Sequence, residues 1–172
     1  MTKLLLSLHV IAAIVAIGPV TVAASVFPPA VRRASAASED PDAWAHVAVL
    51  HRICRVYAVV GVAVPVFGIA TAKNMGVLGD TWLIVSLALT LVAAVVLGAL
   101  VLPRQSTLLE AATAGPADGT RAGDGTRAGA GSGPGVPRAA TVQLAMFTGV
   151  FNLLWATVTI LMIVRPGSTT GA

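Results

Sequence analysis

An uncharged apolar segment near the start of the chain limits what this protein can fold into. Residues 4–27 read LLLSLHVIAAIVAIGPVTVAASVF, and the polar side chains within them are Ser7, His9, Thr21 and Ser25. As a helix rising about 1.5 Å per residue, this segment is roughly 36 Å long, enough to cross a hydrocarbon core of about 30 Å. We therefore predict that it is a transmembrane helix.

A cleaved signal peptide is the alternative interpretation of the same segment. Lys3 precedes the apolar run, and residues 22–25 (VAAS) offer small side chains for cleavage. However, the apolar core of a signal peptide has about 7–15 residues, which is shorter than this run. Cleavage would also carry Arg32 and Arg33 across the membrane. We favour a retained helix and keep cleavage as the alternative.

The composition of the whole chain is that of a membrane protein. Of its 172 residues, 56% are hydrophobic and 10% are charged, and the mean hydropathy is +0.88. Soluble domains carry about 25% charged residues. The basic pI of about 10.2 does not indicate nucleic-acid binding, because Lys and Arg are scattered between apolar runs and form no stripe. With Cys54 as the one cysteine, an intramolecular disulfide is excluded.

The remaining apolar runs predict three more spans, so we expect an all-α fold, a four-helix transmembrane bundle. Pro28-Pro29 is expected to end the first helix, and Pro103-Arg104 the third. The predicted layout is a region 1–110 with helices at 4–27, 47–72 and 81–102 and a first loop at 28–46, then a linker at 111–137, then a region 138–172 with a helix at 140–164.

The linker 111–137 differs in composition from the rest of the chain. Gly, Ala, Thr and Pro dominate it, and the hexapeptide DGTRAG occurs at 118–123 and again at 124–129. Such a segment cannot bury enough apolar surface to offset the entropy of ordering, so we predict a disordered Gly/Ala-rich loop. Low-complexity expansion explains the repeat better than a recognition tag does.

The distribution of Lys and Arg predicts the sidedness of the bundle. Lys3, Lys73 and Arg165 fall on one side. The other side carries eight: Arg32, Arg33, Arg52, Arg55, Arg104, Arg121, Arg127 and Arg138. By the positive-inside rule both termini are outside the cell membrane and both basic loops are cytoplasmic. Arg52 and Arg55 are then expected to contact lipid headgroups at the inner face.

The candidate intramembrane polar site consists of His9, Ser86, Asn152 and Thr159. His9 shares a helical face with small residues, so we expect it inside the bundle, beside Gly68. A buried imidazole needs a partner, and Ser86 or Thr159 is predicted to supply a hydroxyl, with Ser86 slightly favoured. We interpret Asn152 as a bridge between helices rather than as a substrate contact. Whether His9 is functional or structural stays open.

Three classes of function remain open at this stage. We predict an integral membrane protein that acts as an accessory or partner-binding component, as a homo-oligomer or with a membrane partner protein, with the lipid bilayer as its surroundings and no nucleic acid. The alternatives are a haem or metal-linked redox protein using His9, and a small transporter using the inward polar face. A haem held between His9 and His51 is disfavoured, because the two side chains lie at opposite faces of the membrane. No motif predicts an enzyme, a metal site or a resident cofactor, and the spans hold no Asp or Glu for hydrolysis.

Three motifs resemble a family of bacterial integral membrane proteins. They are KLLLSLHVIAAIVAIGP at 3–19, PPAVRRA at 28–34 and VLPRQSTLLE at 101–110. Together they are similar to domain of unknown function 2269, over roughly residues 3–110 and more loosely in the last helix. The insert 111–137 departs from that pattern. The resemblance implies a four-helix membrane protein of bacterial origin and assigns no catalytic residue.

Overall fold

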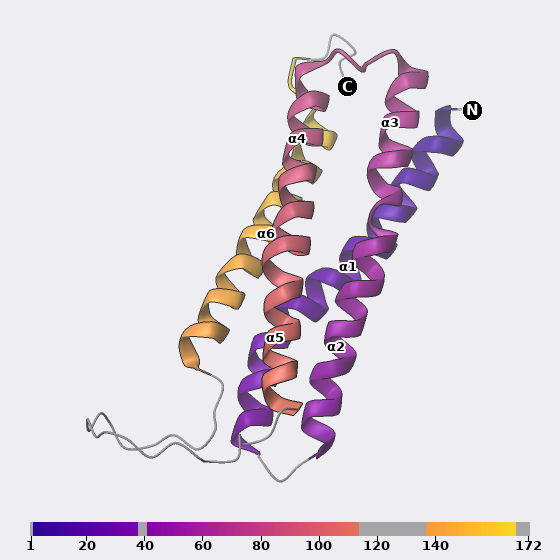
Figure 1. Ribbon diagram of the computed structural model, residues 1–172. Coiled ribbons are helices and arrows are strands. Elements are labelled where there is room, and N and C mark those ends of the chain that lie inside the picture. Colours follow the sequence, from indigo (N-terminus) through magenta and orange to yellow (C-terminus); the bar gives the residue numbers. More distant parts are fainter. Residues whose placement is uncertain (1, 38–40, 114–136, 168–172) are drawn as a thin grey trace.

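The computed structural model describes residues 2–37, 41–113 and 137–167, and in them the chain forms four long helical rods (Figure 1). The helices are α1 (Thr2–Ala36), α2 (Pro41–Val60), α3 (Ala63–Met75), α4 (Thr81–Val95), the π-helix η1 (Val96–Val101), α5 (Leu102–Thr113) and α6 (Arg138–Val164). The pair α2–α3 makes the second rod, and α4, η1 and α5 together make the third. All four rods are long and apolar enough to cross a membrane. The predicted all-α fold with four spans is confirmed.

The start of α1 and the end of α6 lie at the same end of the bundle, together with the turn between α3 and α4 (Figure 1). That turn begins at Gly76, whose φ of 72° is readily adopted by glycine. Gly76 and Val77 donate their N–H groups to the last carbonyls of α3, those of Lys73 and Ala72, at 3.2 Å each. This capping lets the chain reverse within a few residues, so α3 and α4 run antiparallel.

The first helix does not end at Pro28-Pro29, so this part of the prediction is wrong. α1 continues to Ala36, and α2 begins at Pro41, which removes most of the predicted loop 28–46. The φ of proline suits a helix, and the two rings remove only the N–H groups that would bond to Ala24 and Ser25. Beyond them, Val31 and Ala34 are fully buried in the core that α1 shares with α2. That burial offsets the two lost hydrogen bonds.

The second rod contains a break that the sequence analysis did not predict. α2 ends at Val60 and α3 begins at Ala63, whereas one helix was expected over 47–72. Pro65 has no N–H to donate to the carbonyl of Gly61, four residues earlier. Val64 donates to that carbonyl instead, at 3.1 Å, and Val62 donates to Val59 O at 3.1 Å. These two hydrogen bonds join residues three apart instead of four, and this tighter turn separates α2 from α3.

The third rod continues past Pro103, which was expected to end it. The π-helix precedes the proline, with the N–H of Leu102 donating to Leu97 O, five residues back. The backbone hydrogen bonds have therefore already changed to the π-helical pattern before Pro103, which has no N–H to donate. Arg104 adds a hydrogen bond from its guanidinium to Leu100 O at 3.0 Å. The rod then runs to Thr113 as α5, so the first residues of the predicted linker are helical. The rest of the linker up to residue 136 lies outside the described residues. Residues 168–172 of the predicted last region also lie outside them.

The main core lies in the half of the bundle away from the chain termini. Its buried members include Phe27, Val31, Val47, Cys54, Val101, Leu108, Leu144 and Phe151. The half nearest the termini has a smaller cluster around Ala72, Trp82 and Leu83. Packing is thus tight at one end and leaves space at the other.

Candidate functional site

A cavity of about 530 Å³ lies between α1, α3, α4 and α6 in the half of the bundle nearest the termini. Most of its wall is aliphatic, with Leu6, Ile17, Val64, Leu83, Leu87 and Val158 among the lining residues. The polar side chains in the wall are His9, Thr90, Trp155, Thr159 and Arg165. Its size is that of a small-molecule site.

His9 is held in this wall by α3. Its Nδ1 lies 2.9 Å from the backbone carbonyl of Val64. A carbonyl oxygen only accepts, so Nδ1 carries the hydrogen and donates it, and Nε2 of the neutral ring keeps a lone pair. Nε2 makes no hydrogen bond to any residue that the structure describes. His9 is therefore an oriented imidazole with one nitrogen committed and one available.

Gly68 makes room for this imidazole, as predicted from the depth of the two residues. A Cβ atom built on Gly68 would lie 3.0 Å from Cε1 of His9 and 3.3 Å from Nδ1. Any side chain at this position would have to displace the ring or separate α1 from α3. The expected proximity of His9 and Gly68 agrees with this geometry, and the His9 side chain is half-buried.

The hydroxyl partners predicted for His9 are wrong. Ser86 is fully buried but donates to Trp82 O at 2.8 Å. Thr159 lines the cavity but donates to Trp155 O at 2.9 Å. Both hydroxyls bond to the carbonyl four residues back on their own helix, which is a common local alternative for serine and threonine.

Asn152 joins α6 to α1, as predicted for a helix bridge. Its Nδ2 donates to Ser25 Oγ at 3.2 Å. Asn152 does not line the cavity, and neither does Ser86. The four residues of the candidate polar site thus do not form one site: His9 and Thr159 share the cavity, and the other two lie elsewhere.

Three polar atoms on one face of α6 are buried without a hydrogen-bond partner among the described residues. They are Thr148 Oγ1, Asn152 Oδ1 and Trp155 Nε1. Their spacing of four and three residues places them on one side of the helix. An orphaned buried polar group costs about 1–3 kcal/mol, so this face of α6 is a weak point of the packing. This face of α6 adjoins the cavity, because Trp155 is also one of the residues that line it.

A second polar cluster, absent from the sequence analysis, lies between α2 and α5. His51 Nδ1 is 3.0 Å from Oε1 of Gln105, and Gln105 Nε2 is 3.7 Å from the Cys54 sulfur. Gln105 is fully buried. The sequence analysis considered His51 as a possible haem ligand and did not consider Gln105. Extending the third helix past Pro103 would have found it, because Val101, Gln105 and Leu108 then share one face.

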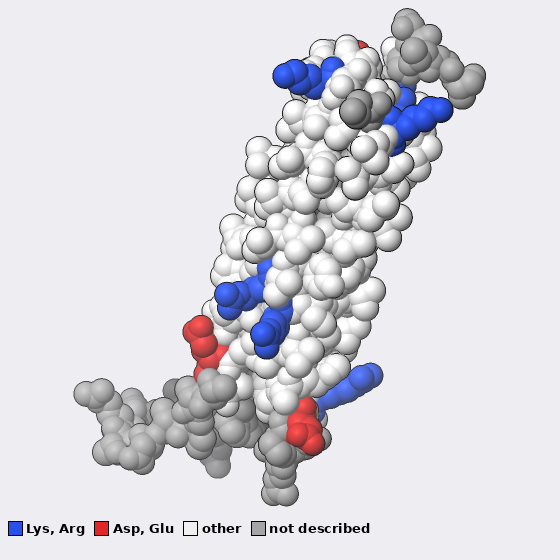
Figure 2. Space-filling view, turned by 90° about the vertical axis from the view of Figure 1, so that its right-hand side faces the viewer, with Lys and Arg blue, Asp and Glu red and all other residues white. Residues whose placement is uncertain are grey.

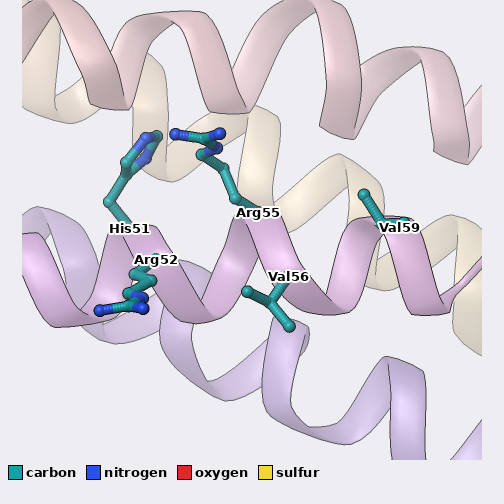
Figure 3. Close-up of a pocket in the computed structure, with 5 residues that line it drawn as sticks. All are labelled: His51, Arg52, Arg55, Val56 and Val59. Carbon is teal, nitrogen blue, oxygen red and sulfur yellow. The ribbon is translucent and has the colours of Figure 1, made fainter.

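His51 also lines a smaller cavity of about 420 Å³, together with Arg52, Arg55, Val56 and Val59 (Figure 3). This cavity and the one beside His9 share no lining residue. The expectation that His9 and His51 do not form a common site therefore agrees with the structure. Within the described ranges, no group of three or more His, Cys, Asp or Glu side chains could hold a metal ion.

The four candidate spans define the class of the protein, which is a multi-pass integral membrane protein. Comparisons with protein-family models, with curated proteins and with solved structures find no match. The resemblance to domain of unknown function 2269 therefore remains a hypothesis.

Proposed function

We propose that this protein is a membrane-embedded binding protein that holds a small amphipathic molecule in the cavity beside His9. The observation that supports this most is the placement of His9. Gly68 is kept free of a side chain so that the ring can enter, and Val64 O fixes its orientation. An oriented imidazole in a mostly aliphatic wall with a few other polar side chains is typical of a ligand site.

The chemistry of the wall indicates the class of ligand. Aliphatic side chains suit a hydrocarbon body, and the free Nε2 of His9 can accept a hydrogen bond from a hydroxyl or protonated carboxyl group of the ligand. Arg165, at the end of α6, supplies a cation for an acidic group at the level of the lipid headgroups. Val10, Ile14 and Ile163 line the cavity and are exposed, so the ligand can enter from the bilayer. A single-chain carboxylic acid fits this description.

Filling the cavity should weaken this binding. Gly18 lines the cavity, and a Cβ atom there would meet nothing within 4 Å. Gly18→Leu therefore adds volume without a backbone clash, and we expect it to weaken binding by about tenfold or more, equivalent to about 1.4 kcal/mol. The measurement is quenching of Trp155 fluorescence by a brominated fatty acid, in a Trp44→Phe/Trp82→Phe background.

Gly149→Leu is the matched control, because a Cβ atom at Gly149 also meets nothing within 4 Å and Gly149 does not line the cavity. This variant should bind like its parent. Absence of saturable quenching in the parent, or equal affinity in the two leucine variants, would contradict the proposed function.

A haem-linked redox protein is the second candidate, and two observations favour it. A histidine that ligates a metal through Nε2 commonly donates its other ring N–H to a carbonyl, as His9 does to Val64. Met162 lines the same cavity and offers a thioether as a second axial ligand. An absorption spectrum of the purified protein separates the candidates. A Soret band that is lost in His9→Ala would replace the first proposal with this one.

The small-transporter alternative has less support. It depended on Asn152 facing a polar path, whereas this side chain bridges α6 to α1. Solute flux in proteoliposomes that is abolished by Asn152→Ala would restore it. No feature of the wall is specific to catalysis, and we propose that the protein is not an enzyme.

We further propose that both termini face outward across the cell membrane. The support is the charge bias of the described residues: Lys3, Lys73 and Arg165 lie at the end where α1 starts and α6 ends, and the other described basic residues, Arg32, Arg33, Arg52, Arg55, Arg104 and Arg138, lie toward the opposite ends of their helices. Alkaline phosphatase fused after Ala37 should be inactive, and the same enzyme fused after Arg165 should be active. The reverse pair of activities would invert the orientation.

A further inference from the structure

The cavity at His51, Arg52 and Arg55 lies at the level of lipid headgroups. Along the second rod, Lys73 and Arg55 are 18 residues apart, or roughly 27 Å at a helical rise of about 1.5 Å per residue. A hydrocarbon core is about 30 Å thick. With Lys73 at one face of the bilayer, Arg55 therefore reaches the other. In the space-filling view, Lys and Arg lie at the upper end of the bundle and again from below its middle downward, with an uncharged belt between the two levels (Figure 2).

Two guanidinium groups at this level are uncommitted. Neither Arg52 nor Arg55 makes an ion pair or a hydrogen bond with the residues that the structure describes. Arg104 differs, because it bonds to Leu100 O and stacks 4.3 Å from the centre of the Phe147 ring. Two free cations three residues apart on one helix favour an anion or water nearby to offset their repulsion.

The geometry of the cavity combines this charge with an apolar track. The side chains of His51 and Arg55 extend to the same side of α2, with the guanidinium next to the imidazole, while Arg52 borders the cavity from the other side (Figure 3). Gln105 anchors the His51 ring at 3.0 Å. Val56 and Val59 continue the lining and are 51% and 73% exposed. A phosphate can meet the cations while a hydrocarbon chain follows the valines.

We propose that this cavity is a binding site for an anionic phospholipid. The headgroup phosphate contacts Arg52 and Arg55 beside the fixed imidazole of His51, and one acyl chain lies along Val56 and Val59. The two cations select a net negative headgroup over a zwitterionic one. This site is separate from the cavity beside His9, and the proposal does not depend on the function proposed for that cavity.

The test is a lipid titration of the full-length protein in phosphatidylcholine nanodiscs. We expect phosphatidylglycerol to bind saturably, measured by native mass spectrometry. In Arg52→Gln/Arg55→Gln the affinity should fall about thirtyfold, from about 1 kcal/mol per basic residue. Arg32→Gln/Arg33→Gln removes the same charge from exposed positions near the end of α1 and should change the affinity little. Equal losses in the two variants would show general charge attraction and overturn the site.

One further variant and one competition measurement identify the ligand. Val56→Ser/Val59→Ser should weaken phosphatidylglycerol binding, because the acyl track is lost. Inorganic phosphate added to the detergent-purified protein should not compete at concentrations comparable to those of the lipid. If phosphate competes as well as the lipid does, or if the valines have no effect, the site binds a free anion and the lipid assignment is wrong. Thermal melting of each variant confirms that it is folded.

Discussion

Replacing Gly68 by valine is expected to lower the stability of the protein on the order of 3 kcal/mol. The new Cβ would lie 3.0 Å from His9 Cε1, and valine adds two methyl groups beyond it. Overpacking of this kind costs about 1–3 kcal/mol. The ring would also lose its bond to Val64 O, now 2.9 Å long, at a further cost of about 1 kcal/mol. The measurement is unfolding of the purified protein in mixed micelles, by denaturing detergent or by heat.

Gly18→Val separates this clash from the general effect of valine in a helix. Both positions are helical glycines, but a Cβ atom at Gly18 meets nothing within 4 Å. The control should therefore be close to neutral. His9→Ala should relieve much of the damage at Gly68, because it removes the ring that the new side chain strikes. If Gly68→Val is no worse than Gly18→Val, the close approach of α1 and α3 is incorrect.

The rods could be predicted from sequence because each depends on local composition. Uncharged apolar runs long enough for a bilayer identify the helices without knowledge of their neighbours. Their ends were predicted less well: the start at Thr81 and the end at Val164 are confirmed, but the largest errors all involve proline. Pro28-Pro29 and Pro103 were expected to stop a helix, yet the chain continues through both. Whether the chain continues depends on what the following turn buries, and that is tertiary information. Val31 and Leu108 supply the burial in these two cases.

The depth of His9 in the membrane could be predicted from the sequence, but its hydrogen-bond partner could not. Counting residues at a helical rise placed His9 beside Gly68, and the structure agrees. The partner of the imidazole is a backbone carbonyl, which leaves no signal in a sequence. Ser86 was preferred because the sequence shows where serine residues, and so hydroxyl groups, lie. However, a serine in a helix often donates to a backbone carbonyl of the same helix, as Ser86 does. Gln105 was missed because the predicted third helix ended at residue 102, three residues before it.

The same buried glutamine gives the second large expected effect. Gln105 is fully buried between α2 and α5 and bonds to His51 at 3.0 Å. Gln105→Ala removes most of a side chain and leaves the imidazole without its partner. Truncation of a large buried side chain costs about 2–5 kcal/mol, so we expect a loss of about 3 kcal/mol in the same unfolding measurement.

Gln143→Ala is the matched control, because Gln143 is exposed on α6, and its truncation should cost less than about 0.5 kcal/mol. A double-mutant cycle then isolates the hydrogen bond. His51→Ala and Gln105→Ala should couple by about 1 kcal/mol, because the second substitution costs less stability when the first has already removed the hydrogen bond. Additive effects would mean that the two side chains are neighbours without a bond. In that case Gln105 would fill space between the helices, and the imidazole beside Arg55 would have no fixed orientation.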